Sequence, residues 1–116
     1  MAVGQKPSGV VQGTLDMLIL KTLALEPLHA YGVGLRIEQI SMGVFQVNAG
    51  SLFPAFRRLE RQGLIEGEWR ATENNRRAKY YILTEQGRKK LKTEAREWQT
   101  QSAAIARILE ATSGEL

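Results

Sequence analysis

The chain has 116 residues, a formal net charge of +4, one histidine and no cysteine. A chain of this length folds as one domain with a real but modest core. Without cysteine there is no disulfide framework, thiol nucleophile or thiolate metal site. A single histidine (His29) and a single aspartate (Asp16) also leave too few groups to assemble a zinc site or a Ser-His-Asp triad readily. We therefore expect a protein that is not an enzyme and that holds no metal or cofactor.

The longest apolar stretch does not predict a membrane span. Asp16 and Lys21 interrupt the stretch from Leu15 to Leu25, which is too short to cross a bilayer. No secretory signal is visible either. The sequence therefore predicts a soluble, cytoplasmic protein.

The positive charge is concentrated in one segment. Residues 1–56 carry three bases and three acids, residues 57–92 carry eleven and five, and residues 93–116 carry two and four. The middle segment thus has an excess of six positive charges, which predicts a polyanion as partner because phosphate contacts dominate nucleic-acid affinity. No lysine-rich helix has an opposing lipid-seeking aromatic face, so a membrane surface is not the expected partner.

The N-terminal third predicts a flexible arm followed by two helices. The arm covers residues 1–12, which are small and polar. Thr14 can cap a first helix that ends before Pro27, and its apolar face follows the spacing of a helix at Leu15, Leu18, Ile19, Thr22 and Leu23. A second helix is predicted for residues 30–41, after His29 at its start, with three side chains directed inward: Val33, Ile37 and Ile40. Gly43 breaks it, and residues 44–47 can form a short strand.

A third predicted helix has one apolar and one cationic face. At 100° per residue, Leu52, Phe56 and Leu59 share one side. The other side carries Ser51, Pro54, Arg57, Arg58 and Arg61. If Asn48 capped this helix, Pro54 would cost a helical hydrogen bond. We therefore favour a start near Gly50 or Ser51, with Ser51 as the cap and Pro54 in the first turn.

A basic hairpin follows this helix after Gly63. Its predicted strands are residues 64–70 and 78–83, and Asn74 and Asn75 suit the positive φ of a hairpin tip. Tyr80 and Tyr81 point to opposite faces of a strand, so one should be buried and the other more exposed. We expect Trp69 to pack under the hairpin.

This order of elements predicts the fold and its partner. A helix that is buried on one side and cationic on the other, followed by a basic hairpin (the wing), is typical of a winged helix-turn-helix that binds DNA. The fold class is then mainly α with a small β-hairpin wing. An amphipathic surface helix whose arginines are merely solvated is the alternative interpretation.

The last predicted helix begins after Thr84 and carries a heptad-like seam. The seam residues, spaced four and three apart, are Leu91, Ala95, Trp98, Ser102, Ile105 and Leu109. The seam can fold back on its own core or pair with another chain. We favour a two-fold homodimer, because the earlier helices already fill the core. Trp98 is either plain filler of the seam or one wall of a pocket for an aromatic ligand.

Four stretches resemble the PadR family of bacterial transcriptional regulators. They are GTLDMLILKTL, LHAYGVGLRIE, GSLFPAFRRLERQGLIEGEW and RRAKYYILTEQGRKKL, which together cover most of residues 13–98. The resemblance implies a homodimeric winged-helix repressor that binds inverted-repeat operators in double-stranded DNA, and that a small aromatic or cationic ligand can release. The domains it implies are residues 13–84 for DNA binding and residues 85–116 for dimerisation.

The resemblance also implies particular site residues. The DNA-facing positions would be Tyr31, Ser51, Pro54, Arg57, Arg58 and Arg61, with Arg76, Arg77 and Lys79 on the wing. Trp98 stands where some members place a tryptophan next to a ligand cavity in the dimer. The chain departs from the family in having Ala30 for a usual glycine, Phe53 for a usual tyrosine, and Asn74 and Asn75 for a glycine pair. A winged-helix module that binds protein or RNA, without an operator, is the alternative function.

Overall fold

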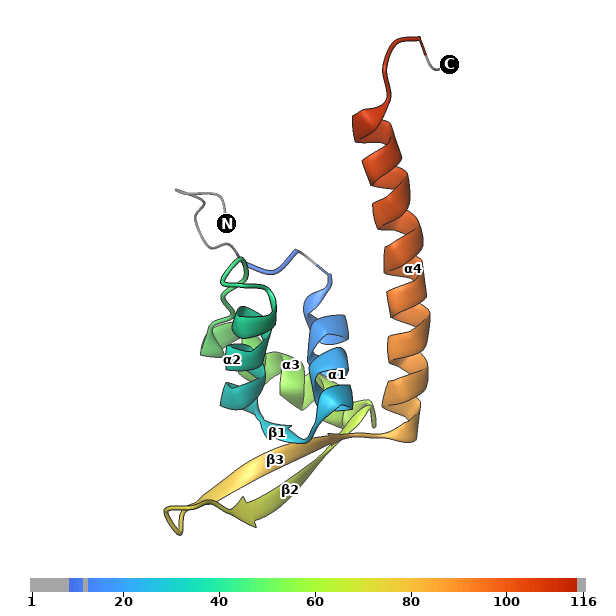
Figure 1. The fold of residues 1–116 in the computed structure, drawn as a ribbon. Helices are drawn as coiled ribbons and strands as arrows, with labels where there is room; N and C mark the ends of the chain where they lie inside the picture. Colours follow the sequence, from blue (N-terminus) through green and yellow to red (C-terminus); the bar gives the residue numbers. More distant parts are fainter. Residues whose placement is uncertain (1–8, 12, 115–116) are drawn as a thin grey trace.

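The computed structural model describes residues 9–11 and 13–114 of the chain. The predicted arm, residues 1–12, therefore lies almost wholly outside the described residues. Within them, helices α1, α2 and α3 lie over a three-stranded antiparallel sheet of order β1-β3-β2, and α4 rises from the end of the sheet beside α1 (Figure 1). This arrangement confirms the predicted fold class, a winged helix-turn-helix followed by a long C-terminal helix. Among the described residues, no helix is long and apolar enough to cross a membrane.

The first two helices keep close to their predicted bounds. Helix α1 spans Leu15–Leu25 and α2 spans Ala30–Ile40. His29 caps α2, since its Nδ1 accepts a hydrogen bond from the Gly32 N–H at 2.9 Å. The short strand β1, Leu28–His29, joins the two helices and was not predicted. Ile40 was predicted to point inward but is 59% exposed, because it lies in the last turn, past the contact of α2 with the core.

Helix α3 spans Ala49–Arg61 and begins earlier than predicted. Asn48 is the cap, not Ser51: the Asn48 side chain accepts from the Ser51 N–H at 2.9 Å. Such a cap stabilises a helix by about 1 kcal/mol. Pro54 therefore lies inside the helix and leaves the Gly50 carbonyl without its helical donor. Gly50 is exposed, so water can serve that carbonyl and the loss is tolerated.

The predicted strand at residues 44–47 is wrong, since only Phe45 forms an isolated bridge there. The Phe45 N–H donates to the Ser41 hydroxyl at 3.1 Å instead of entering a ladder. Phe45 and Val47 pack against the core. The segment between α2 and α3 is thus anchored by side chains rather than by a partner strand.

The wing consists of β2, Ile65–Ala71, and β3, Arg77–Leu83. At its tip Asn75 has a φ of 60°, in agreement with the predicted turn. Tyr81 is buried and Tyr80 half-buried, which confirms the expected division between the two tyrosines. Trp69 was expected to pack under the wing but is 58% exposed. Trp69 lies in the half of β2 nearer the hairpin tip, and the hairpin extends beyond the helices (Figure 1).

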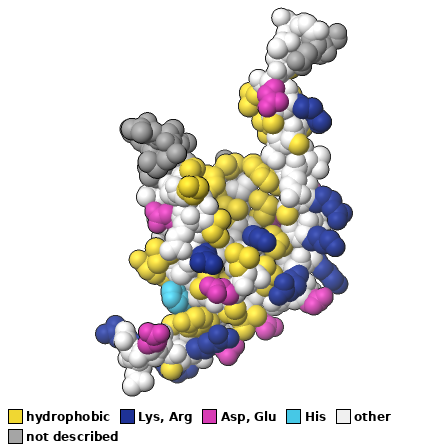
Figure 2. All heavy atoms as spheres, viewed as in Figure 1, with side chains coloured by type: hydrophobic (Ala, Val, Ile, Leu, Met, Phe, Trp, Pro, Cys, Tyr) yellow, Lys and Arg dark blue, Asp and Glu magenta, His cyan; other side chains and the backbone are white. Residues whose placement is uncertain are grey.

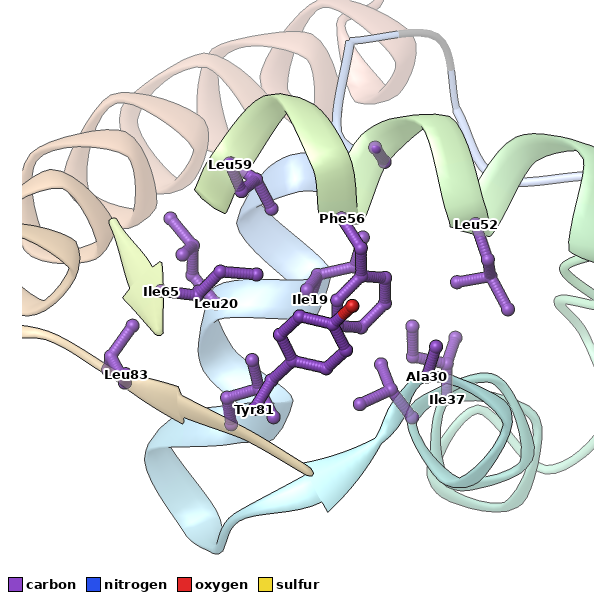
Figure 3. Close-up of a cluster of buried hydrophobic side chains, with 13 residues drawn as sticks. Ile19, Leu20, Ala30, Ile37, Leu52, Phe56, Leu59, Ile65, Tyr81 and Leu83 are labelled. Carbon is purple, nitrogen blue, oxygen red and sulfur yellow. The ribbon is translucent and has the colours of Figure 1, made fainter. Parts of the chain in front are cut away.

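The core sits between α1, α2, α3 and the sheet. Its largest fully buried side chains include Phe56, Ile19 and Leu59. Figure 3 shows the Phe56 ring, from α3, against the Tyr81 ring, from β3, and their centroids are 4.6 Å apart. This contact packs α3 directly on the base of the wing.

Helix α4, Glu85–Glu110, is joined to the wing by a single threonine. The Thr84 hydroxyl accepts from the Gly87 N–H at 3.0 Å and donates to the Gly63 carbonyl at 2.7 Å. It thereby caps α4, as predicted, and ties it to the end of α3. Leu91 packs against the core, while the C-terminal half of α4 projects away from the body (Figure 1).

Candidate nucleic-acid interface

The solvent-facing side of α3 presents two free arginines. Leu52, Ala55, Phe56 and Leu59 bury the inner side of the helix. On the outer side Arg57 and Arg61 are exposed, and neither forms an ion pair with any described residue. They lie one helical turn apart, so both guanidinium groups can contact the same region of a bound partner. Pro54 and Ser51 are exposed nearer the start of the helix.

Arg58 is held in a different way from its neighbours. Its Nη2 and Nε donate to the two carboxylate oxygens of Asp16, at 2.5 and 3.4 Å. Such a two-point contact fixes the guanidinium plane and ties α3 to α1. The sequence placed Arg58 on the cationic face, but it did not indicate this acidic partner. The Arg58 side chain is 43% exposed and remains within reach of solvent on one edge.

Lys79 joins the wing to α3. Its Nζ lies 3.2 Å from Glu60 Oε1 and 5.4 Å from the centroid of the Tyr81 ring. Gly67 makes room for it, since a Cβ at that position would lie 2.1 Å from Lys79 Cε. The charge of Lys79 is therefore partly compensated, and the ion pair links the wing to α3.

The wing tip carries Arg76 and Arg77, both exposed. A tight turn presents them, in which the Thr72 N–H donates to the Arg76 carbonyl at 2.6 Å and the Asn75 N–H donates to the Thr72 carbonyl at 3.0 Å. The Arg77 guanidinium carbon lies 5.5 Å from the centroid of the Trp69 indole. The tip thus presents two cations beyond the body of the protein.

A groove of about 490 Å³ runs between α2 and the start of α3. Tyr31, which is 68% exposed, and Phe53, which is 47% exposed, lie along it. A hydrogen bond of 3.1 Å from the Gln46 side chain to Glu38 spans one side. Tyr31 and Phe53 therefore lie on the same flank of the molecule, beside the start of α3.

The predicted seam of α4 is only partly covered. Leu91, Ala95 and Ser102 are half-buried, whereas Trp98 is 37%, Ile105 52% and Leu109 79% exposed. Figure 2 shows apolar side chains gathered beside α4 over the neighbouring body of the protein. Trp98 borders an open recess of about 340 Å³ between α1 and α4, together with Met17, Lys90, Glu94 and Glu97.

Comparison with known proteins agrees with this geometry. Residues 19–93 match the transcriptional regulator PadR-like family. The chain belongs to this family. Its DNA-binding and regulatory role follow from that membership, and the resemblance seen in the sequence is confirmed.

Individual known proteins resemble most of the chain. An uncharacterised protein X of Lysinibacillus sphaericus is 28% identical over 91 residues, which are 78% of this chain and 84% of that protein. A PadR family transcriptional regulator from Eggerthella lenta DSM 2243 is 31% identical, with a TM-score of 0.74 and coverage of 87% and 86%. A transcriptional regulator from Clostridium thermocellum is 26% identical, with a TM-score of 0.77 and coverage of 85% and 96%.

Sequence reasoning missed the residues that hold the PadR-like interface in place. Asp16 and Glu60 are 42 and 19 residues from the cations they bind. No local spacing indicates such pairs. The exposure of Trp69 was also missed, and strand alternation could not have indicated it, because Trp69 shares its face of the hairpin with the buried residues Ile65 and Tyr81.

Proposed function

We propose that this PadR-like chain is a homodimeric repressor that binds an inverted-repeat operator. In this proposal α3 enters the major groove and the wing follows the adjacent backbone or minor groove. The observation that carries the proposal is the pair of free arginines, Arg57 and Arg61, on the outermost face of α3. The exposed cations of the wing tip, Arg76 and Arg77, extend the same basic surface.

The ion pairs support a division of labour among the cations. Arg57 and Arg61 are the candidates for reading guanine edges, where an arginine contact discriminates by about 1–3 kcal/mol. Arg58 and Lys79, each held by a carboxylate, fix the orientation of α3 and of the wing, with free N–H groups left for phosphates. The Tyr31 hydroxyl would donate a hydrogen bond to the DNA backbone from the flank of α3. Ser51 and Pro54 would contact the DNA backbone near the start of α3.

Dimerisation through α4 would place two recognition helices on one duplex. The exposed seam residues Trp98, Ile105 and Leu109 are large side chains on a helix that projects from its own body, which supports pairing with a second copy. Two-fold pairing would present the two α3 helices to half-sites roughly 34–36 Å apart. The operator would then be palindromic.

We further propose that a flat aromatic or cationic ligand binds beside Trp98 and releases the DNA. The recess at Trp98 is bordered by two carboxylates, Glu94 and Glu97, which favour a cation, while the indole face favours a planar ring. A ligand that prefers one angle between the paired α4 helices would change the spacing of the α3 helices. It would shift the DNA-binding equilibrium only by its differential affinity for the two states.

The test of the DNA-binding proposal is anisotropy of a labelled duplex that carries a site selected from a random-sequence pool. Wild-type protein should bind with an affinity that falls steeply with salt, by roughly one logarithmic unit per unit of log salt for each phosphate contact. The combined variant Arg57→Ala, Arg58→Ala and Arg61→Ala should lose this binding. If it binds as tightly as wild type, α3 is not the reader; binding to RNA or protein alone would favour the alternative module.

Ligand release has its own test, which uses the two tryptophans of the chain. In a Trp69→Phe background the fluorescence reports Trp98 alone. Titration with a planar cationic dye should quench it at sub-millimolar concentration and lower the affinity for the duplex. The matched variant Trp98→Ala, compared with its own duplex affinity in the absence of dye, should show no further loss of affinity when the dye is added. If no planar cation or aromatic compound quenches Trp98, the tryptophan is filler of the seam.

A further inference from the structure

Trp69 is exposed on the face of the wing that is turned toward α3. It is opposite Lys79 in the register of the hairpin, and cross-strand partners share a face. Lys79 reaches Glu60 of α3 from that face, and Tyr81, two residues further on, packs against Phe56 of α3. A tryptophan that is 58% exposed costs hydration free energy unless something covers it. Trp69 therefore lies on the α3-facing side of the wing but beyond the residues that α3 covers, where another molecule can reach it.

Arg77 lies on the same face as Trp69. It is opposite Ala71, so it is the diagonal neighbour of the indole, and its guanidinium carbon is 5.5 Å from the ring centroid. A guanidinium stacked on an aromatic face keeps its N–H donors at the edge of the stack, free to bind phosphate. The stack also restricts the long Arg77 side chain before binding. The side chain therefore loses less rotamer entropy when it binds a phosphate.

The opposite face of the same hairpin carries a contrasting pair. Arg70 lies over the Tyr80 ring, at 5.3 Å from its centroid. Its Nη2 is also 3.4 Å from Glu68 Oε2, so a carboxylate compensates its charge. Arg77 has no ion-pair partner in the part of the chain that the structure describes. Of these two stacked arginines, only the one on the α3 side is therefore left free for an anion.

We propose that Trp69 is a positioning residue for DNA binding, which holds the guanidinium of Arg77 ready for a phosphate of the duplex beside α3. This inference rests on the proposed function. Trp69 acts through Arg77: removal of the indole leaves the charge in place but frees the side chain to move. Removal of the uncharged Trp69 side chain should therefore weaken DNA binding in the same way as removal of the Arg77 charge.

The experiment compares five variants by anisotropy of the same labelled duplex over a series of salt concentrations. They are Trp69→Ala, Trp69→Phe, Arg77→Ala, the double variant Trp69→Ala with Arg77→Ala, and Arg70→Ala. Trp69→Ala should weaken binding about three- to tenfold, which is the range of a cation–π contact. It should also lower the salt slope, as Arg77→Ala does. The double variant should bind no more than about twofold more weakly than Arg77→Ala, because the two residues act as one unit.

Two variants serve as controls. Trp69→Phe keeps an aromatic face and should stay within about twofold of wild type. Arg70→Ala removes the same charge from the opposite face and should also stay within about twofold, with an unchanged slope. Circular dichroism checks that each variant is folded. We expect this result because the substituted side chains are exposed.

The outcomes separate the inference from the proposed function. Wild-type binding together with an unaffected Trp69→Ala variant would overturn the inference alone. Effects of Trp69→Ala and Arg77→Ala that multiply in the double variant would do the same, as would a Trp69→Ala slope equal to that of wild type. A wild-type chain that binds no duplex would overturn the proposed function and the inference together.

Discussion

The ion pair between Arg58 and Asp16 makes the role of Arg58 measurable apart from that of its neighbours. The two side chains are 43% and 30% exposed, so solvent screens their attraction. Exposed pairs contribute up to about 1 kcal/mol, and two-point geometry places this pair toward the upper end, at about 0.5–1 kcal/mol. For a domain of this size that corresponds to a fall in Tm of roughly 2–6 °C.

We predict that Arg58→Ala lowers the Tm by this amount, whereas Arg57→Ala leaves it unchanged. Operator affinity should behave in the opposite way, with Arg57→Ala weakening binding about tenfold or more through loss of a base contact, and Arg58→Ala weakening it less. The assays are thermal unfolding by circular dichroism, at one protein concentration because dimerisation affects Tm, and anisotropy on the selected duplex.

A double-mutant cycle with Asp16→Asn isolates the pair. Asp16 lies in the first turn of α1, so its charge also interacts with the helix dipole, by about 0.3–1 kcal/mol. That contribution is present whether or not Arg58 is there and cancels in the cycle. A coupling of zero, together with an Arg58→Ala variant that loses operator binding as fully as Arg57→Ala, would refute the reasoning and make Arg58 a reader.

Three further predictions concern the frame that carries the interface. Gly87→Ala should unfold at a lower temperature, by an amount that corresponds to about 1–3 kcal/mol, because the new Cβ would lie 2.1 Å from the Leu64 carbonyl oxygen; an unchanged Tm in calorimetry would contradict this packing. Gly67→Ala should displace Lys79 from Glu60 with little loss of stability, and should weaken duplex binding without abolishing it; anisotropy and Tm measured side by side check this. Ile105→Asp should give monomer in sedimentation at tens of micromolar, since an unpaired charge in an apolar dimer interface costs about 3–5 kcal/mol, whereas Ala106→Glu, one position outside the seam, should remain dimeric. A wild-type chain that is monomeric at that concentration would refute dimerisation through the α4 seam.

The sequence by itself determined the elements and their order. Apolar periodicity placed α1, α2 and the buried side of α3, and the alternation of the wing strands separated Tyr80 from Tyr81. Thr84 correctly predicted the start of α4. These features follow from local physics, because caps, turns and helical faces depend on residues a few positions apart.

Only the tertiary structure decided which cations are free. Arg57, Arg58 and Arg61 look alike in the sequence, yet Asp16 on α1 holds Arg58, while the other two form no ion pair with a residue that the structure describes. Trp69 looked like a core residue, but the hairpin carries it past the last helix that could cover it, beside Arg77. Both outcomes depend on how distant segments pack. Ion pairing and exposure are properties of the assembled surface, and they decide which arginines a phosphate can reach.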